Sequence, residues 1–123
     1  MGYRSDVALA MYKTDYDKLI EFSKQRMDDD NDCVSLYDFI TKYVDDIIPK
    51  KDNKIVILCW EWVKWYEEYY HIATLNEYLE DNDIDYTFVR IGEELDDNEE
   101  IRAKDDDLAW IVNIQRFIDV RGE

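Results

Sequence analysis

The chain has 123 residues, with 31 acidic against 15 basic side chains and a formal net charge of −16. This excess argues against binding to DNA, RNA or an anionic membrane, because each would repel it. A hydrophobic content of 46%, with four Trp, ten Tyr and four Phe, argues against disorder. No apolar run could cross a bilayer, and the first residues lack a signal-peptide layout. We therefore expect one folded domain, residues 1–123, in the cytoplasm.

The first half of the chain predicts one strand followed by two helices. Residues 3–12 predict a strand covered on both faces, because small and apolar residues lie on both sides of it. Thr14 and Asp15 predict a helix start. A second helix is predicted over about 34–47, ending before Pro49, because proline disfavours a helical conformation in the residue before it. Its apolar stripe consists of Leu36, Phe39, Ile40, Tyr43 and Ile47.

The second half predicts three strands and one helix. Residues 54–63 form a continuous apolar and aromatic run, typical of a strand buried on both faces. We expect Trp60 and Trp62 to share one face of this strand and to lie in the core. A helix is predicted over about 67–81. The remaining predicted elements are strands over 86–91 and 110–117.

This order, β-α-α-β-α-β-β, predicts an α+β fold. We expect a single four-stranded, mainly antiparallel sheet with helices packed mostly on one face. Such an arrangement is related to ferredoxin-like folds, in which helices cross over between strands of one sheet.

Catalytic signatures are few. His71 is the only histidine, so catalytic triads and histidine-rich zinc sites lack their usual parts. The carboxylates stand in polar runs that read as solvated, whereas a catalytic pair needs partial burial to separate its pKa values. We predict a protein that is not an enzyme and has neither a cofactor nor a metal site.

The segment 93–107 is the first candidate for a binding surface, because nine carboxylates stand there against two basic side chains. Solubility requires a net charge of magnitude only about 2–8 in a small domain, so the larger negative charge of this chain suggests a role in binding. Carboxylates three or four residues apart on a helix lie about 5–6 Å apart, dense enough to imitate nucleic-acid phosphates. The predicted partner-binding acids are Glu93, Glu94, Asp96, Asp97, Glu99, Glu100, Asp105, Asp106 and Asp107.

A second candidate is the aromatic stretch after the 54–63 strand. Trp65, Tyr66 and Tyr69 alternate with charged residues, which favours partial exposure. Tryptophan and tyrosine are over-represented among the residues that dominate protein interfaces. An acidic and aromatic surface suits a protein partner better than a nucleic acid.

Three segments carry a resemblance to a known group of proteins. They are Gly2-Tyr3-Arg4-Ser5-Asp6-Val7-Ala8, Val63-Lys64-Trp65-Tyr66-Glu67, and Arg90-Ile91-Gly92-Glu93-Glu94-Leu95-Asp96-Asp97-Asn98-Glu99-Glu100. In this order they resemble a family of small acidic proteins encoded by tailed bacteriophages and prophages. The resemblance implies a phage origin and a location in the cytoplasm of a bacterial host.

Our leading hypothesis is a phage-encoded inhibitor that covers a basic surface of a host defence protein, such as a CRISPR–Cas effector or a restriction enzyme. It would do so as a monomer or small homo-oligomer, by imitating nucleic acid without binding it. An alternative is a phage structural or accessory protein, or a homo-oligomeric adaptor, that uses its aromatic residues for association. A third hypothesis is an enzyme that uses a carboxylate cluster with a divalent metal.

Overall fold

Strand β1 (Ser5–Tyr12) lies in the middle of the sheet because its residues are apolar on both faces. Val7, Leu9 and Met11 point to one face, and Ala8 and Ala10 point to the other. All five are fully buried, as the prediction of a doubly covered strand requires. The computed structural model describes residues 2–25, 35–94, 96–114 and 118–120.

Across those described residues the main sheet has five strands, each antiparallel to its neighbours. Their order across the sheet is β2 (Asp46–Lys50), β3 (Ile55–Val63), β1, β4 (Tyr86–Ile91) and β5 (Asn98–Ile101). The α+β class and the antiparallel sheet are therefore confirmed, whereas the prediction of four strands is wrong. Helices connect β1 to β2 and β3 to β4, and in both cases another strand lies between the two that are connected. This is the split β-α-β connectivity expected for ferredoxin-like relatives.

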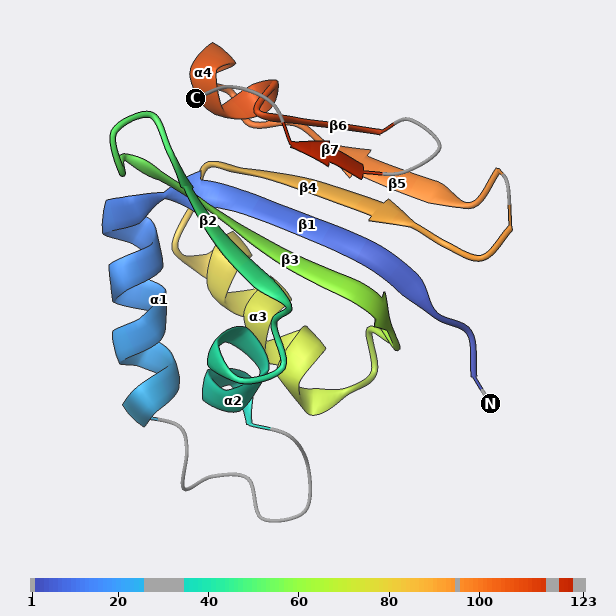
Figure 1. Ribbon diagram of the computed structural model, residues 1–123. Coiled ribbons are helices and arrows are strands. Elements are labelled where there is room, and N and C mark those ends of the chain that lie inside the picture. Colours follow the sequence, from blue (N-terminus) through green and yellow to red (C-terminus); the bar gives the residue numbers. More distant parts are fainter. Residues whose placement is uncertain (1, 26–34, 95, 115–117, 121–123) are drawn as a thin grey trace.

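Three helices cover one face of the sheet (Figure 1). They are α1 (Lys13–Gln25), α2 (Leu36–Thr41) and α3 (Tyr70–Asp81). Their apolar residues pack against Leu9, Leu58 and Trp60 of the sheet in the larger of two core clusters. Phe39 stacks on Trp60 with ring centroids 4.9 Å apart, and its carbonyl accepts a hydrogen bond from Trp60 Nε1 at 3.1 Å.

A second layer covers the opposite face (Figure 1). It consists of α4 (Asp106–Ala109), β6 (Val112–Ile114) and β7 (Ile118–Val120). Strands β6 and β7 pair with each other as a separate ribbon. The predicted strand over 110–117 is thus shorter than expected and does not belong to the main sheet, and residues 115–117 lie outside the described part. Leu108 and Ile111 of this layer pack where Ala8 and Ala10 leave room on β1.

The prediction of one helix over 34–47 is wrong. Helix α2 ends at Thr41, and β2 begins at Asp46 and pairs with β3. Tyr43 and Ile47, placed on the buried stripe by the helical spacing, are 58% and 44% exposed. The spacing misled because it does not register that β3, which follows β2 after a four-residue turn, offers hydrogen-bond partners to this segment.

The expectation that Trp62 lies in the core beside Trp60 is also wrong. Trp60 is 1% exposed, but Trp62 is 61% exposed and its φ is +56°. The β1–β3 register shifts here, because Val7 is opposite Trp60 while Ser5 is opposite Val63. Such a bulge adds a residue to one strand and redirects the side chains that follow.

The described part of the acidic segment 93–107 consists of a turn, the strand β5, a connection and the first two residues of the four-residue helix α4. Strand β5 escaped prediction because its four residues are exposed and show no alternation of apolar and polar side chains. It forms by pairing with β4. Among the described residues, no helix has the length and apolarity needed to cross a membrane.

Candidate protein-binding site

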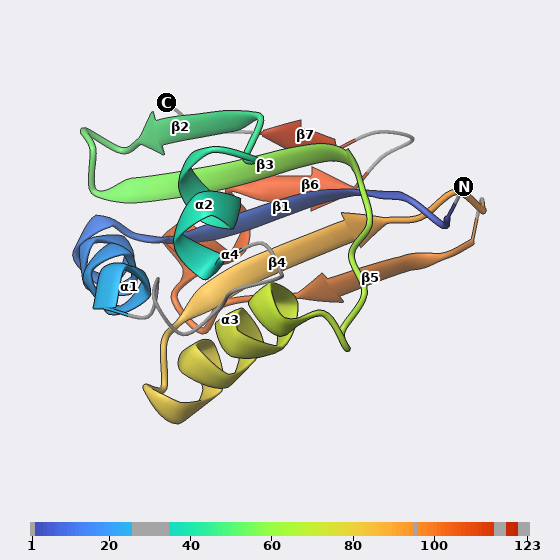
Figure 2. The same ribbon diagram turned by 90° about the horizontal axis from the view of Figure 1, so that it is seen from below.

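A groove of about 480 Å³ opens between α3 and the β4–β5 edge of the sheet, on the face that carries the three larger helices. Figure 2 shows α3 running beside β4 and β5 on this face. Strand β5 extends the sheet past β4, so the side chains of β4 and β5 form one wall and those of α3 the other.

The floor of the groove is apolar and its rim is acidic. The apolar lining consists of Leu9, Trp65, Leu75, Leu79, Ile84, Tyr86, Phe88 and Ile101. The exposed acids of the lining are Glu67, Glu77, Glu80, Asp83 and Glu99. Asn76 completes the described lining, which therefore contains no lysine or arginine.

Four of the five rim acids form no ion pair within the described residues. Glu99 is paired, because Arg90 Nε lies 2.6 Å from its Oε1. The described residues provide no ion-pair partner for Glu67, Glu77, Glu80 or Asp83. Carboxylates that neighbour an apolar, low-dielectric surface attract a cation more strongly than carboxylates in bulk water do. The groove is thus suited to a ligand that is apolar at its centre and positively charged at its margin.

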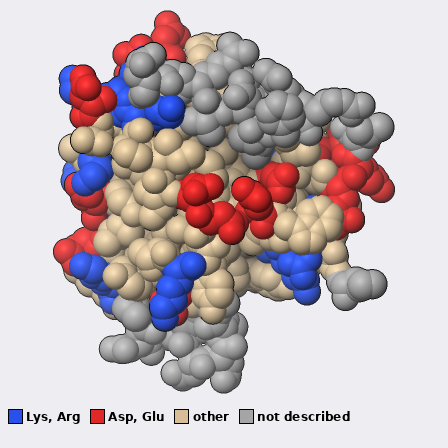
Figure 3. Space-filling model, viewed as in Figure 1, with Lys and Arg blue, Asp and Glu red and all other residues tan. Residues whose placement is uncertain are grey.

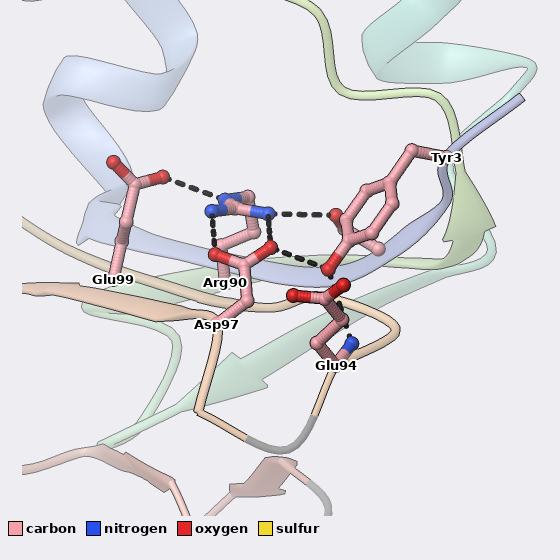
Figure 4. A network of polar contacts seen from close by, with 6 residues as sticks. Tyr3, Arg90, Glu94, Asp97 and Glu99 are labelled. Atoms are coloured by element: carbon pink, nitrogen blue, oxygen red, sulfur yellow. Dashed lines mark hydrogen bonds and ion pairs between the residues drawn. The ribbon is translucent and has the colours of Figure 1, made fainter.

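A polar cluster around Arg90 holds β5 in place (Figure 4). Arg90 Nη2 lies 2.8 Å from Asp97 Oδ1, and Arg90 Nη1 donates to Ser5 Oγ at 2.9 Å. Tyr3 Oη donates to Asp97 Oδ2 at 2.5 Å and accepts from the Glu94 backbone N–H at 3.1 Å. The N-terminal segment, β4 and the β4–β5 turn are therefore tied together beside the groove.

This cluster shifts the ionisation of its members. Hydrogen bonds from Arg90 and from Tyr3 lower the pKa of Asp97 below its ordinary value. Burial lowers the pKa of Arg90, but its hydrogen bonds to Asp97 and Glu99 outweigh burial and raise it. The pKa of Tyr3 is raised, chiefly by its hydrogen bond to Asp97. Asp97 is therefore a positioning residue held in its charged form.

Five of the nine predicted acids form hydrogen bonds or ion pairs with other groups of the protein. Glu93 accepts from the Arg4 backbone N–H at 2.7 Å, and Glu100 pairs with Arg102. The carboxylate of Asp105 accepts a hydrogen bond from Tyr12 and caps α4 by accepting from the Asp107 N–H. The others are Asp97 and Glu99, described above.

The remaining four predicted acids are Glu94, Asp96, Asp106 and Asp107, all exposed. Glu94 and Asp96 belong to the β4–β5 turn, whereas Asp106 and Asp107 lie in α4 in the opposite layer. On the face drawn in Figure 3, carboxylates form several groups separated by lysines, arginines and uncharged surface. The role of the nine acids in partner binding stays a prediction.

The three predicted aromatic residues are all half-buried. Trp65 packs against Trp60 and Phe88, with ring centroids 5.5 Å away in each case, and its surface lines the groove. Tyr66 Oη accepts a hydrogen bond from the Tyr3 N–H at 2.7 Å, and its ring contacts Tyr69 at 5.0 Å. Of the twelve predicted partner-binding residues, the structure brings Trp65 and Glu99 into the groove.

Sequence reasoning missed most of the rim. Glu77 and Glu80 stand three residues apart on the exposed side of α3, a spacing that placed them on one helix face and was available from the sequence. Glu67 and Asp83 precede and follow α3, and no local pattern marks them. The opposite wall could not be found, because it depends on the pairing of β5 with β4.

The described residues contain no group of three or more His, Cys, Asp or Glu side chains arranged to hold a metal ion. Burial, followed by the nearby carboxylates Asp46, Glu61 and Asp45, raises the pKa of Cys59 to about 11, which keeps its thiol protonated at neutral pH. The groove itself, within the described lining, has no serine, cysteine or lysine that could act as a nucleophile. Its arrangement can bind and orient cations.

Comparisons with protein families, with curated proteins and with solved structures find no match for this chain. The resemblance to phage proteins accordingly stays a prediction. The assignment of a function depends on the groove and on the charge of the chain.

Proposed function

We propose that this protein is a non-enzymatic binding protein that covers a basic surface of a partner protein. One observation carries the proposal: the groove has an apolar floor and five carboxylates on its rim, and its described lining includes no basic side chain. Apolar contact supplies affinity, and the carboxylates supply steering and selection for positive charge.

The biological setting that we propose is a phage-infected bacterial cytoplasm, where the protein inhibits a host defence protein that handles nucleic acid. The net charge of −16 supports this choice, because the channels of CRISPR–Cas effectors and restriction enzymes must be basic to hold a polyanion. The same charge repels nucleic acid itself, so inhibition proceeds through protein contact. Acids of the groove that form no ion pair within the described residues, and those of the 93–107 segment, compete with phosphates for the basic residues.

A direct experiment measures binding to a basic apolar probe, such as a short fluorescent peptide composed of Leu and Lys. We expect the double variant Glu77→Gln/Glu80→Gln to bind about 2- to 30-fold more weakly than the wild type, because two rim charges are lost. The matched control is Asp46→Asn/Asp52→Asn, which removes the same charge from β2 and the turn after it, at the sheet edge opposite to β5. Equal weakening by both double variants would show that net charge, and not the groove, determines binding.

A second candidate function is a homo-oligomeric adaptor or a phage structural protein. Three large aromatic side chains outside the groove favour it: Trp62, Trp110 and Tyr43 are 61%, 59% and 58% exposed. Light scattering after size exclusion separates the candidates, because an adaptor of this kind is a stable oligomer and the inhibitor described above is a monomer or a weak, small oligomer. Replacement of Trp62 by Gln dissociates the oligomer if that surface mediates it.

A further inference from the structure

One edge of the main sheet has backbone groups that point away from the protein. The N–H of Gly92 donates to the carbonyl of Asp97 at 2.7 Å, which fixes the alternation of the β4–β5 ladder. Arg90 and Glu99 are directly opposite each other two residues further along, so they exchange hydrogen bonds in the same way. In β5, therefore, the N–H and C=O groups of Asn98 and Glu100 face outward, and within the described chain no strand lies beyond them.

The other edge of the sheet is β2, in which Pro49 disfavours the addition of a further strand. The N–H of Lys13 donates to the carbonyl of Lys54 at 2.8 Å, which sets the β1–β3 ladder and hence the alternation in β2. Ile48 bonds to β3, while Ile47 and Pro49 face outward. Because Pro49 has no N–H, a strand added to this edge would lose a hydrogen bond at its centre.

The open edge adjoins the groove. Glu99 and Ile101 of β5 both line it, as residues two apart on a strand share a face. A strand added beside β5 would place every second side chain on that same face, next to the apolar floor and the acidic rim. The groove and the edge are thus two parts of one recognition surface.

Charge decides what kind of strand can bind. A second copy of this chain would add its own net charge of −16, and its β5 would offer the rim no lysine or arginine. A segment with Lys or Arg would instead complement the four acids of the rim that have no ion pair within the described residues. Charge therefore disfavours pairing between copies and favours a basic strand.

We propose that an extended basic segment of a partner protein binds as an additional strand along β5. Only every second side chain of this segment faces the groove. Of these side chains, those at the centre are apolar and contact the floor, and those at the ends are Lys or Arg and contact the acidic rim. Hydrogen bonds from the outward N–H and C=O groups of Asn98 and Glu100 fix its register. This inference rests on the proposed function and specifies how the same groove recognises its partner.

The test compares two short peptides of equal composition made of Leu, Lys and Thr. In the alternating peptide every second residue is Thr and the residues between read Lys, Leu, Leu, Lys, so that Leu and Lys share one face of a strand. In the other peptide the same Leu and Lys residues stand at helical spacing. We expect the alternating peptide to bind more tightly. Hydrogen exchange of the Asn98 and Glu100 amides should become slower when it is bound, because these two N–H groups then donate to the added strand.

Glu100→Pro removes one outward N–H and leaves the β4–β5 ladder intact, since that N–H does not bond to β4. We expect this variant to stay folded and to bind the alternating peptide at least about tenfold more weakly than Glu100→Gln, which removes the same charge. Should Glu100→Pro fail to fold, hydrogen exchange in the wild-type complex decides the question.

Tighter binding of the helically spaced peptide, with unchanged exchange of both amides, would overturn strand addition and leave the proposed function standing. Failure of both peptides to bind at low salt would overturn the proposed function itself.

Discussion

Trp62 combines an exposed side chain with a left-handed backbone. Its N–H donates to Asp6 Oδ1 at 2.9 Å and its carbonyl accepts from Arg4 Nη1 at 3.2 Å. The preceding N–H, of Glu61, donates to Asp45 Oδ2 at 2.6 Å. A left-handed conformation costs a non-glycine residue about 1–2 kcal/mol, so these side chains hold the bulge against its own strain.

Replacing Trp62 by Gly should therefore raise the free energy of unfolding by up to about 1 kcal/mol, because relief of strain exceeds the extra flexibility of glycine in the unfolded chain. Urea denaturation measures the change. Trp60→Ala is the contrasting variant, since loss of a buried tryptophan lowers the free energy of unfolding by about 3–5 kcal/mol. A loss of more than about 2 kcal/mol in Trp62→Gly would mean that its side chain packs in the core.

Ionised Asp97 should contribute to the free energy of unfolding, and this contribution should be lost at acid pH. Its pKa in the folded protein is lowered, so its contribution is fully present above the ordinary aspartate value and is lost as pH falls through the lowered value. We expect Asp97→Asn to be less stable than the wild type at pH 7, and we expect the difference to shrink at acid pH. Chemical denaturation between about pH 2 and pH 7 follows it. The exposed neighbour Asp96 provides the control: Asp96→Asn should change stability little at pH 7.

The two faces of β1 belong to two different cores, and its side chains are sized accordingly. Ala8 and Ala10 face the layer of α4 and the β6–β7 ribbon, whereas Leu9 and Met11 face the three larger helices. Small residues let the second layer approach the sheet closely. The larger side chains of β1 fill the space beneath the helices.

Ala10→Leu should consequently lower the free energy of unfolding by about 1–3 kcal/mol, since the added atoms have no space under α4. Met11→Leu, on the opposite face, conserves volume and should cost less than about 1.5 kcal/mol. Thermal or urea denaturation compares the two. A neutral Ala10→Leu variant would contradict close packing of the second layer.

Charge is distributed over the whole molecule and is only partly gathered at the groove. Arg90 and Arg102 pair with acids of β5 and of the β4–β5 turn, and Lys13 pairs with Asp17. The formal net charge of −16 nevertheless leaves many acids without a cation. Repulsion among them opposes the compact state.

Added NaCl should therefore stabilise the fold and weaken partner binding at the same time. Salt screens repulsion among the acids and, equally, attraction between the groove and a basic segment, over a Debye length of about 10 Å at 0.1 M. Urea denaturation and peptide binding, each measured from about 0.05 to 0.5 M NaCl, report the two effects. Binding that is independent of salt would refute the electrostatic part of the proposal.

Local pattern was sufficient for β1 and for most of β3, which are buried on both faces, and for α3, which buries one side. Alternating or continuous apolar residues predicted β1 and β3, and apolar residues at helical spacing predicted most of α3. Side chains that face a core are apolar, so they recur along the sequence at the spacing of a strand or of a helix. Local pattern failed for β2 and β5. Both are edge strands with many exposed residues, so pairing with the neighbouring strand of a hairpin, and not their own composition, makes them strands.

Composition and periodicity by themselves determined that this chain is a strongly acidic α+β domain with a doubly covered central strand. Tertiary structure decided the rest. The pairing of β5 with β4 built the second wall of the groove, and the bulge in β3 turned Trp62 outward. The first is a hairpin pairing, and the second joins residues distant in sequence. In both cases the free energy comes from backbone hydrogen bonds, which the spacing of apolar side chains along the sequence does not record.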